Sequence, residues 1–205
     1  MNPKWLDWSQ RLQAIAQSGL TFTRNPFEIE RYEQVREIAA EIAAAHSDLD
    51  APQIEAVFKG QRGYATPKLD VRGVVFQDGK VLLVKELCDG RWTLPGGWCD
   101  VGEPPSLATE REVYEESGYK VQATKVLALY DRNRHDHPPS LMHIYKVFFL
   151  CQLVGGCATT SIETDGAEFF AETALPPLST PRTTETQLHR FFEHHRHPEW
   201  PTDFD

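Results

Sequence analysis

The spacing of apolar residues changes near residue 66 and divides the chain into two predicted regions. Over residues 1–62 apolar residues recur every three or four positions, as they do on amphipathic helices. From Lys68 onward they alternate with polar residues or run together in short stretches, as in β-strands. We therefore predict an N-terminal helical domain over residues 1–62 and a sheet-containing domain over residues 66–205.

Three short helices are expected in the N-terminal region. The first starts at Asn2-Pro3, ends at Ser18-Gly19 and has an apolar stripe made of Trp5, Trp8, Leu12, Ile15 and Ala16. The second begins with a capping box at Asn25–Glu28, and its apolar side comprises Ile29, Tyr32, Val35, Ile38, Ala39 and Ile42. The third runs from Asp50 to Gly60. Because such helices bury little apolar surface alone, we expect them to dock on a partner subunit as a dimer contact, or on the second domain of their own chain.

The second region predicts a mixed sheet flanked by helices, an α/β or α+β layered domain. A turn at Gln77-Asp78-Gly79 joins the first two strands into a hairpin. One helix is predicted over residues 105–117, with Gly118 as its C-terminal stop, and another follows Pro181. The histidines after that last helix are expected in a solvated tail. The predicted strands are Leu69–Phe76, Lys80–Glu86, Trp92–Leu94, Tyr119–Tyr130, Leu141–Val154 and Ala167–Ala171.

The helix over residues 105–117 gathers negative charge on one face. Glu112, Glu115 and Glu116 stand at i, i+3 and i+4, a spacing that destabilises an isolated helix. Carboxylate oxygens suit Mg²⁺, which is commonly shared between a few carboxylates and substrate phosphates. Arg111 lies four residues before Glu115 and can orient it or neutralise part of the cluster, and Glu103 can fold back from before the helix. The pattern predicts a cation at this face.

A glycine turn precedes the acidic helix. The strand Trp92–Leu94 runs into Pro95-Gly96-Gly97, and glycine lets the backbone approach an ion or a phosphate closely. From Gly97 to Tyr119 the chain resembles the signature of the Nudix hydrolases: Gly, five residues, Glu, seven residues, Arg-Glu, aliphatic, any, Glu-Glu, any, Gly, aliphatic. Every fixed position matches, and the single departure is Tyr119 at the last, normally aliphatic, position.

The resemblance implies a Nudix-type α/β/α sandwich that hydrolyses a nucleoside diphosphate linked to another moiety X, releasing a nucleoside monophosphate and phospho-X. It also implies Mg²⁺ or Mn²⁺ as cofactor. The helical N-terminal region, together with Thr66–Gly73 and Gly97-Trp98, is similar to a bacterial subgroup that includes CDP-choline and ADP-ribose pyrophosphatases. We expect a small nucleoside diphosphate derivative as the substrate.

Site residues follow from the signature and from charged positions near it. Metal ligands are expected at Glu112 and Glu116, then at Glu115 and the Gly96 carbonyl. The residue that activates water is expected among Glu103, Glu115 and Glu163 or Glu168, with Arg111 beside them in the catalytic cluster. Substrate-binding residues are expected at Arg72, Lys85, Gly97, Asp131 and Arg132, the last two in a polar insertion between strands.

The composition of the chain narrows the range of possible binding partners. The net charge of −9 disfavours nucleic acid as the main partner, because non-specific binding needs a basic surface. There is no signal peptide pattern and no apolar run long enough to span a membrane, so we expect a cytoplasmic protein without a membrane partner. The four cysteines form no Cys-x-x-Cys pair, which indicates neither zinc nor a disulfide framework.

Two other functions compete with the hydrolase hypothesis. A non-catalytic module could use the same fold to sense a nucleotide-sugar, although the complete set of carboxylates argues against it. A Nudix enzyme that processes RNA ends is the second alternative, because RNA also presents phosphates to a metal. The acidic charge of the chain makes that role the weaker one.

Overall fold

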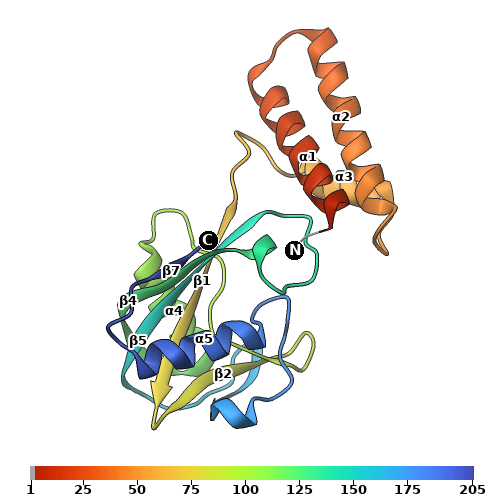
Figure 1. Cartoon of the computed structure of the whole chain (residues 1–205). Helices are drawn as coiled ribbons and strands as arrows, with labels where there is room; N and C mark the ends of the chain where they lie inside the picture. Colours follow the sequence, from red (N-terminus) through yellow and green to blue (C-terminus); the bar gives the residue numbers. More distant parts are fainter. Residues whose placement is uncertain (1–2) are drawn as a thin grey trace. The chain divides into compact units, whose positions relative to one another are not determined.

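The computed structural model describes residues 3–205, which form two compact units. One unit comprises the chain up to Lys68 together with Pro139–His143, and the other comprises Leu69–Pro138 and Ile144–Asp205. Figure 1 labels the elements of both units. The predicted helix start at Asn2 lies outside the described residues.

The first unit is built on three helices: α1 (Lys4–Phe22), α2 (Pro26–Ala44) and α3 (Ala51–Lys59). Its buried core consists of small side chains on α2, namely Ala39, Ala40 and Ala43, packed against Ile54 and Phe58 of α3. Polar bonds also join the helices: the Ser9 hydroxyl donates to the Ala39 carbonyl at 2.8 Å. Alanine and serine let helix backbones approach closely, so this unit relies on close helix contact more than on bulky apolar residues.

The apolar stripe predicted on α1 is wrong at two of its five positions. Trp8 and Ile15 are more than half exposed, whereas Ala16 is buried and Trp5 and Leu12 pack against the core of the unit. The other buried positions of α1 are Leu6, Ser9 and Gln13. The predicted stop at Gly19 is also wrong, because α1 continues to Phe22. A Cβ atom at Gly19 would lie 2.4 Å from the Tyr32 ring, so glycine there serves helix packing instead of helix termination.

The capping box predicted at Asn25 is wrong in one half. The Asn25 side chain accepts a hydrogen bond from the Phe27 N–H, as a helix cap does. Glu28, however, bonds the Thr23 hydroxyl at 2.6 Å instead of returning to the Asn25 N–H. A reciprocal box forms at α3 instead, between Asp50 and Gln53.

The second unit is a seven-stranded mixed sheet with a helix on each face, which confirms the predicted fold class. The strand order is β3-β2-β1-β5-β4-β7, and β6 pairs with β2. β1 pairs with β2, β2 with β3 and β6, and β4 with β5 in antiparallel fashion, whereas β4 and β7 are parallel. The bounds are β1 Lys68–Gln77, β2 Lys80–Glu86, β3 Trp92–Thr93, β4 Tyr119–Asp131, β5 Ile144–Gly156, β6 Thr164–Phe170 and β7 Asp203–Phe204, with 3-10 helices at Arg132–Arg134 and Glu172–Ala174.

Helix α4 (Pro105–Ser117) and helix α5 (Glu185–Arg196) cover opposite faces of this sheet. Val71, Val75 and Val113 belong to the core cluster on the α4 face, whereas Val74, Phe148 and Phe191 belong to the cluster on the α5 face. Alternate residues of β1 therefore face opposite layers, as the strand period requires. This alternation decides on which face each charged residue of β1 lies.

Helix α4 has the predicted bounds, and Gly118 ends it in a left-handed conformation with φ 76°. Three strand predictions need correction: β5 begins at Ile144 instead of Leu141, β6 covers Thr164–Phe170 instead of Ala167–Ala171, and β7 was not predicted. The prediction of a solvated histidine tail is correct only in part. His195 and His197 are exposed, but His194 is buried in α5, and the chain after the helix returns to the sheet. Within residues 3–205 no helix is both long and apolar enough to cross a membrane.

Candidate active site

The glycine turn lies directly against strand β1. The Val71 N–H donates to the Gly97 carbonyl at 2.8 Å, and the Gly73 N–H donates to the Pro95 carbonyl at 2.9 Å. Gly96 has φ 141°, and a Cβ atom there would lie 2.1 Å from the Val71 carbonyl oxygen. Only glycine can occupy this position, and its contacts fix the turn on the sheet.

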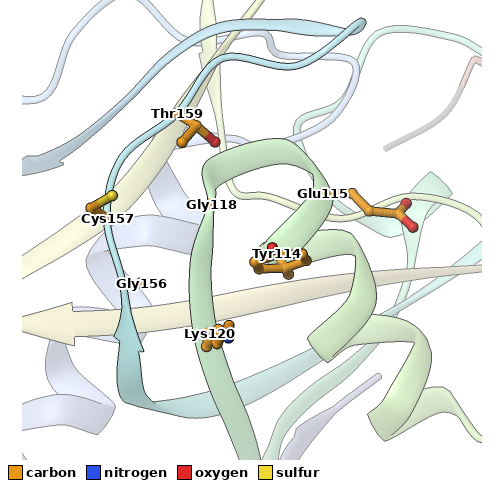
Figure 2. A pocket seen from close by; sticks show the side chains of 7 residues that line it. All are labelled: Tyr114, Glu115, Gly118, Lys120, Gly156, Cys157 and Thr159. Atoms are coloured by element: carbon orange, nitrogen blue, oxygen red, sulfur yellow. The ribbon is translucent and has the colours of Figure 1, made fainter.

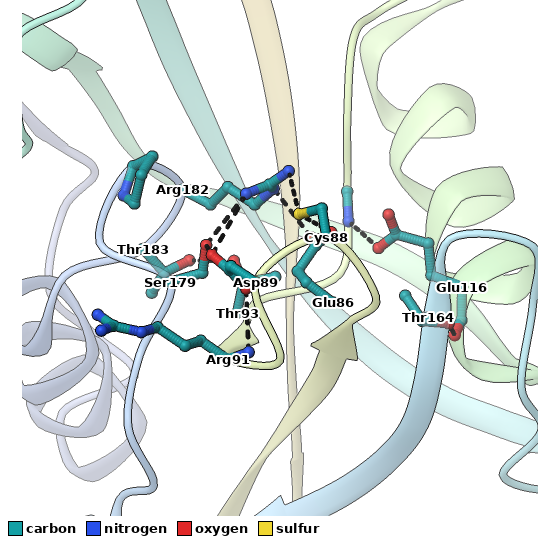
Figure 3. A network of polar contacts seen from close by, with 12 residues as sticks. Glu86, Cys88, Asp89, Arg91, Thr93, Glu116, Thr164, Ser179, Arg182 and Thr183 are labelled. Atoms are coloured by element: carbon teal, nitrogen blue, oxygen red, sulfur yellow. Dashed lines mark hydrogen bonds and ion pairs between the residues drawn. The ribbon is translucent and has the colours of Figure 1, made fainter. Parts of the chain in front are cut away.

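Two carboxylates of α4 lie against this turn. Glu116 accepts a hydrogen bond from the Gly96 N–H at 2.8 Å, drawn in Figure 3. A Cβ atom at Gly97 would lie 2.9 Å from Oε2 of Glu112, so the missing side chain leaves the space that this carboxylate uses. Because Glu112 and Glu116 are one helical turn apart, α4 presents both of them to the same stretch of backbone.

Burial strongly perturbs these carboxylates. Glu116 is only 6% exposed, and burial raises its pKa to about 8, although the positive charge of Arg72 and the Gly96 N–H oppose the shift. Burial also raises the pKa of Glu112, against hydrogen bonds and charge from Arg111. No cationic side chain among residues 3–205 lies within ion-pair distance of Glu116. A buried carboxylate without a cation partner is a costly arrangement unless a cation binds there.

Arg111 donates hydrogen bonds to three carboxylates of the signature. Its Nε donates to both oxygens of Glu103 at 3.2 Å, and its Nη2 donates to Glu103 Oε2 at 3.0 Å. Its Nη1 donates to Glu112 at 2.9 Å and to Glu115 at 3.0 Å. The hydrogen bonds to Glu103 are the main reason why the pKa of Arg111 is raised. One guanidinium thus holds together three of the carboxylates that the sequence singled out.

The residues fit a divalent cation, although their arrangement is not that of a preformed metal cage. In the described part of the chain no three His, Cys, Asp or Glu residues stand together as a ready metal site. Arg111 holds Glu112 and Glu115, while the Gly96 N–H holds Glu116. The donor set is nevertheless all oxygen, as Mg²⁺ and Mn²⁺ require, and Glu116 and Glu112 converge on a turn without side chains.

Comparison with known proteins gives the same conclusion as this geometry. Residues 66–193 match the family model described as the NUDIX domain. The chain belongs to the Nudix hydrolase family. Residues 3–58 match a second model, described as a UDP-X-like, N-terminal oligomerisation domain. The predicted enzyme class, a Nudix pyrophosphohydrolase, is therefore confirmed. Nudix hydrolases generally use divalent metal ions, and their substrates are small nucleoside diphosphate derivatives.

Two of the relatives match along essentially the whole chain. It is 45% identical over 202 residues to the putative ADP-ribose pyrophosphatase YjhB of Bacillus subtilis, with 98% of this chain and 97% of that one aligned. A solved UDP-X diphosphatase is 34% identical with a TM-score of 0.64, and all of both chains is covered. An ADP-ribose pyrophosphatase from Streptococcus suis is 43% identical with a TM-score of 0.63, covering 68% of this chain and 100% of that one.

The predicted substrate residues of this Nudix domain occupy different surroundings. Arg72 is buried and grips Asp70 with two hydrogen bonds, of 3.0 and 2.8 Å. Arg132 is also buried, directly after β4. Lys85 is partly exposed, 4.0 Å from Asp165, and Asp131 accepts the Asn133 N–H at 2.9 Å.

Glu163 and Glu168 are both exposed on or just before β6. The Glu163 carbonyl accepts the Leu87 N–H, which places this residue beside the end of β2. The neighbouring Thr164 hydroxyl donates to the Glu116 carbonyl at 2.6 Å, so the segment lies against the end of α4. Neither glutamate forms a described ion pair with Arg111 or another cation.

Sequence analysis did not single out Asp70 or its contact with Lys146. Lys146 donates to Asp70 Oδ1 at 2.6 Å and lies beside Phe148 of the α5-face core. A lysine within an otherwise apolar strand run, and an aspartate two residues before Arg72 on the same strand face, were the available signals. Both residues are nearly inaccessible to solvent.

Arg182 ties the segment before α5 to the end of β2 (Figure 3). Its Nε lies 2.9 Å from Glu86 Oε1, and its Nη1 donates to the Ser179 hydroxyl at 3.0 Å. Ser179 in turn donates to Asp89 at 2.8 Å. Burial raises the pKa of Glu86, and the charge of Arg182 opposes this. This network fixes the segment before α5 against the end of β2.

An open pocket of about 380 Å³ lies at the C-terminal end of α4 (Figure 2). It is lined by Tyr114, Glu115, Gly118, Lys120, Gly156, Cys157 and Thr159. Tyr119, the one departure from the signature, does not enter it and packs edge to face on Phe169. Only Glu115 belongs to both this pocket and the Arg111 cluster.

Proposed function

We propose that this Nudix enzyme hydrolyses the pyrophosphate bond of a nucleoside diphosphate joined to another moiety, of the ADP-ribose or CDP-choline type, with Mg²⁺ or Mn²⁺ as cofactor. The observation that carries the proposal is the convergence of Glu112 and Glu116 on the Gly96-Gly97 turn. The full-length similarity to a protein named a putative ADP-ribose pyrophosphatase and to a UDP-X diphosphatase supports the substrate class.

Glu112 and Glu116 would hold the cation, with Glu115 and the Gly96 carbonyl as further ligands. A divalent ion bound there neutralises phosphate charge and lowers the pKa of water. Arg111 positions Glu103, Glu112 and Glu115 through its hydrogen bonds, so ligand binding must compete with this guanidinium. The rigid turn on β1 keeps the backbone side of the site in place.

The general base is proposed among Glu103, Glu115 and Glu163. Three hydrogen bonds from Arg111 engage both oxygens of Glu103, which reduces its capacity to take a proton. Glu163 lies outside the Arg111 cluster. Glu115 combines membership of the cluster with one oxygen free of described hydrogen bonds and a mostly exposed carboxylate. Glu115 is therefore the first residue to test as the base.

The test is a substrate panel analysed by product mass. Purified protein is incubated with ADP-ribose, CDP-choline and UDP-sugars, with Mg²⁺, Mn²⁺ or EDTA. The proposal expects metal-dependent release of a nucleoside monophosphate and phospho-X from at least one compound, and a loss of turnover in Glu116→Gln. No turnover of any compound, or the same turnover in EDTA, would refute it.

We also propose that the N-terminal unit forms a homodimer. Trp8, Ile15 and Phe22 recur every seven residues on α1 and are 52%, 55% and 69% exposed, and Phe27 and Ile38 of α2 are exposed as well. Large apolar side chains exposed along one helix are typical of an interaction surface. The match of residues 3–58 to an oligomerisation domain supports self-association.

Light scattering of the full chain tests the dimer. Wild type is expected at twice the mass of the chain, and Trp8→Glu with Ile15→Glu at the mass of one chain with unchanged helix content. Lys80→Glu reverses an exposed charge in the hairpin of the second unit, so it serves as the control that should remain dimeric. A monomeric wild type at micromolar concentration would refute the proposal.

A further inference from the structure

A cluster of buried charges lies on the α5 face of the sheet and has more cations than carboxylates. Asp70 and Arg72 of β1, Lys146 of β5 and Arg132 after β4 are each less than 7% exposed. Asp70 is the only carboxylate among these four residues. The charges of Glu116 and Glu86 also act on Arg72, so the uncompensated cations are Lys146 and Arg132, which share Asp70. Burying an excess of positive charge is energetically costly unless a bound anion neutralises it.

The hydrogen bonds show which cations remain available. Nε and Nη2 of Arg72 are used on Asp70, and its Nη1 donates to the Leu94 carbonyl at 3.1 Å. Lys146 uses one donor on Asp70. Arg132 makes a single long bond, 3.5 Å, from Nη2 to the Pro181 carbonyl, and no ion pair with any residue between 3 and 205. Arg132 and Lys146 therefore keep most of their donors free.

These two cations are neighbours. Tyr130 of β4 stands opposite Lys146 of β5, and Arg132 follows Tyr130 by two residues. Burial, and then the charges of Arg72 and Arg132, lower the pKa of Lys146 to about 8, although Asp70 opposes the shift. His137 adds no charge, because burial lowers its pKa to about 4. The two cations thus share one low-dielectric region.

The site is held in place and reaches solvent. His137 anchors the loop after Arg132, with Nδ1 2.7 Å from the Thr180 carbonyl and Nε2 3.1 Å from Gln187. Nε and Nη1 of Arg132 have no described partner, yet they are not among the fully buried atoms that lack one. Both nitrogens therefore keep some accessible surface, although Arg132 as a whole is only 5% exposed.

We infer that Arg132 and Lys146 form an anion site that binds a phosphoryl group of the substrate, with Asp70 and Arg72 as the residues that position Lys146. Both oxygens of Asp70 are already occupied, so the site offers donors only. A phosphoryl group is an acceptor-only anion and satisfies such donors, whereas a base edge with an amino group does not. The inference rests on the proposed function, and Arg72 links the two sites because its charge also acts on Glu116.

Binding to the full-length protein in EDTA tests the site without the metal. Calorimetric titrations with AMP and UMP are compared with adenosine and uridine. The monophosphates are expected to bind and the nucleosides to bind at least tenfold more weakly. Arg132→Gln and Lys146→Gln should each weaken monophosphate binding at least tenfold, and the exposed cations Arg91 and Lys80 provide matched controls as Arg91→Gln and Lys80→Gln.

Kinetics with metal supply the second readout. On a substrate that wild type hydrolyses, Arg132→Gln should raise KM at least tenfold and change kcat less. If a variant does not fold, Arg132→Lys and Lys146→Arg, which keep the charge, should retain monophosphate binding. Equal binding of nucleosides and monophosphates, or unchanged binding and KM in both Gln variants, would overturn the inference. A wild type that binds monophosphates but hydrolyses nothing would instead refute the proposed function alone.

Discussion

Gly97→Ala is the sharpest test of how the turn and α4 form the site. The new Cβ would lie 2.9 Å from Oε2 of Glu112 and 3.2 Å from its Cδ, while ordinary contacts begin near 3.4 Å. Glu112 must therefore move by about 0.5 Å, more than twice the ~0.2 Å tolerance of metal–ligand distances. Displacements of this order cost about 10- to 100-fold in rate when they misplace reacting groups.

The assay is steady-state hydrolysis at limiting and saturating Mg²⁺, alongside thermal unfolding. We expect kcat/KM to fall about 10- to 100-fold and the Mg²⁺ requirement to rise, with a loss of stability below about 1 kcal/mol, because the obstructed atoms belong to the end of a flexible side chain.

Two other glycine-to-alanine substitutions give the expected lower and upper limits of the effect. Gly155→Ala introduces a Cβ with no atom within 4 Å and should leave both rate and stability unchanged. Gly96→Ala combines φ 141° with a contact of 2.1 Å to the Val71 carbonyl, so it should destabilise the fold by more than the ~1–3 kcal/mol of the dihedral strain alone. A wild-type rate for Gly97→Ala at limiting Mg²⁺ would show that the contact with Glu112 does not set the geometry of the site.

Three further predictions concern charge. Glu116→Gln should lower kcat about 1000-fold, equivalent to about 4 kcal/mol. In EDTA it should nevertheless unfold at a temperature no lower than wild type, because burial raises the pKa of Glu116 to about 8 and the carboxyl is therefore mostly uncharged at pH 7, as the amide is; a large drop in melting temperature would contradict this. EDTA should abolish hydrolysis, and Mg²⁺ or Mn²⁺ in excess should restore it; activity that survives dialysis against EDTA would count against the metal. Hydrogen bonds from Arg190 lower the pKa of Asp203 to about 2, below its usual value of 3.8, so its stabilising effect is complete above about pH 4 and is lost as the pH falls toward 2. Urea unfolding should therefore show a stability gap between wild type and Asp203→Asn that narrows from pH 5 to pH 2, and a constant gap would argue against this linkage.

Local signals were sufficient for the elements that carry the signature. Helix α4 has the bounds that its proline start and glycine stop predicted, because both ends depend on residues adjacent in sequence. The helical spacing of Glu112, Glu115 and Arg111 also predicted that these side chains would meet, and the structure brings Glu103 to them. Their roles in metal binding and catalysis remain predictions for the variants above.

Features that depend on distant packing were not predictable in this way. The buried face of α1 includes Ser9, which bonds the Ala39 carbonyl of α2, and Gln13, which bonds the Phe58 carbonyl of α3; a search for apolar stripes passes over both polar residues. The cluster of Asp70, Lys146 and Arg132 joins three segments whose proximity comes only from the strand order β1-β5-β4. No local pattern in any one of the segments shows that the others will supply its partners.

The two-residue strand β7 has a role beyond its length. It lies at the outer end of the strand order, where it pairs with Ala128 and Leu129 of β4, and Asp205 accepts the Asp131 N–H at 2.6 Å. An uncovered edge strand offers free N–H and C=O groups to any other chain. β7 therefore shields the end of β4 around Ala128 and Leu129 from intermolecular pairing, and acid conditions that release Asp203 would leave this part of the edge prone to aggregate.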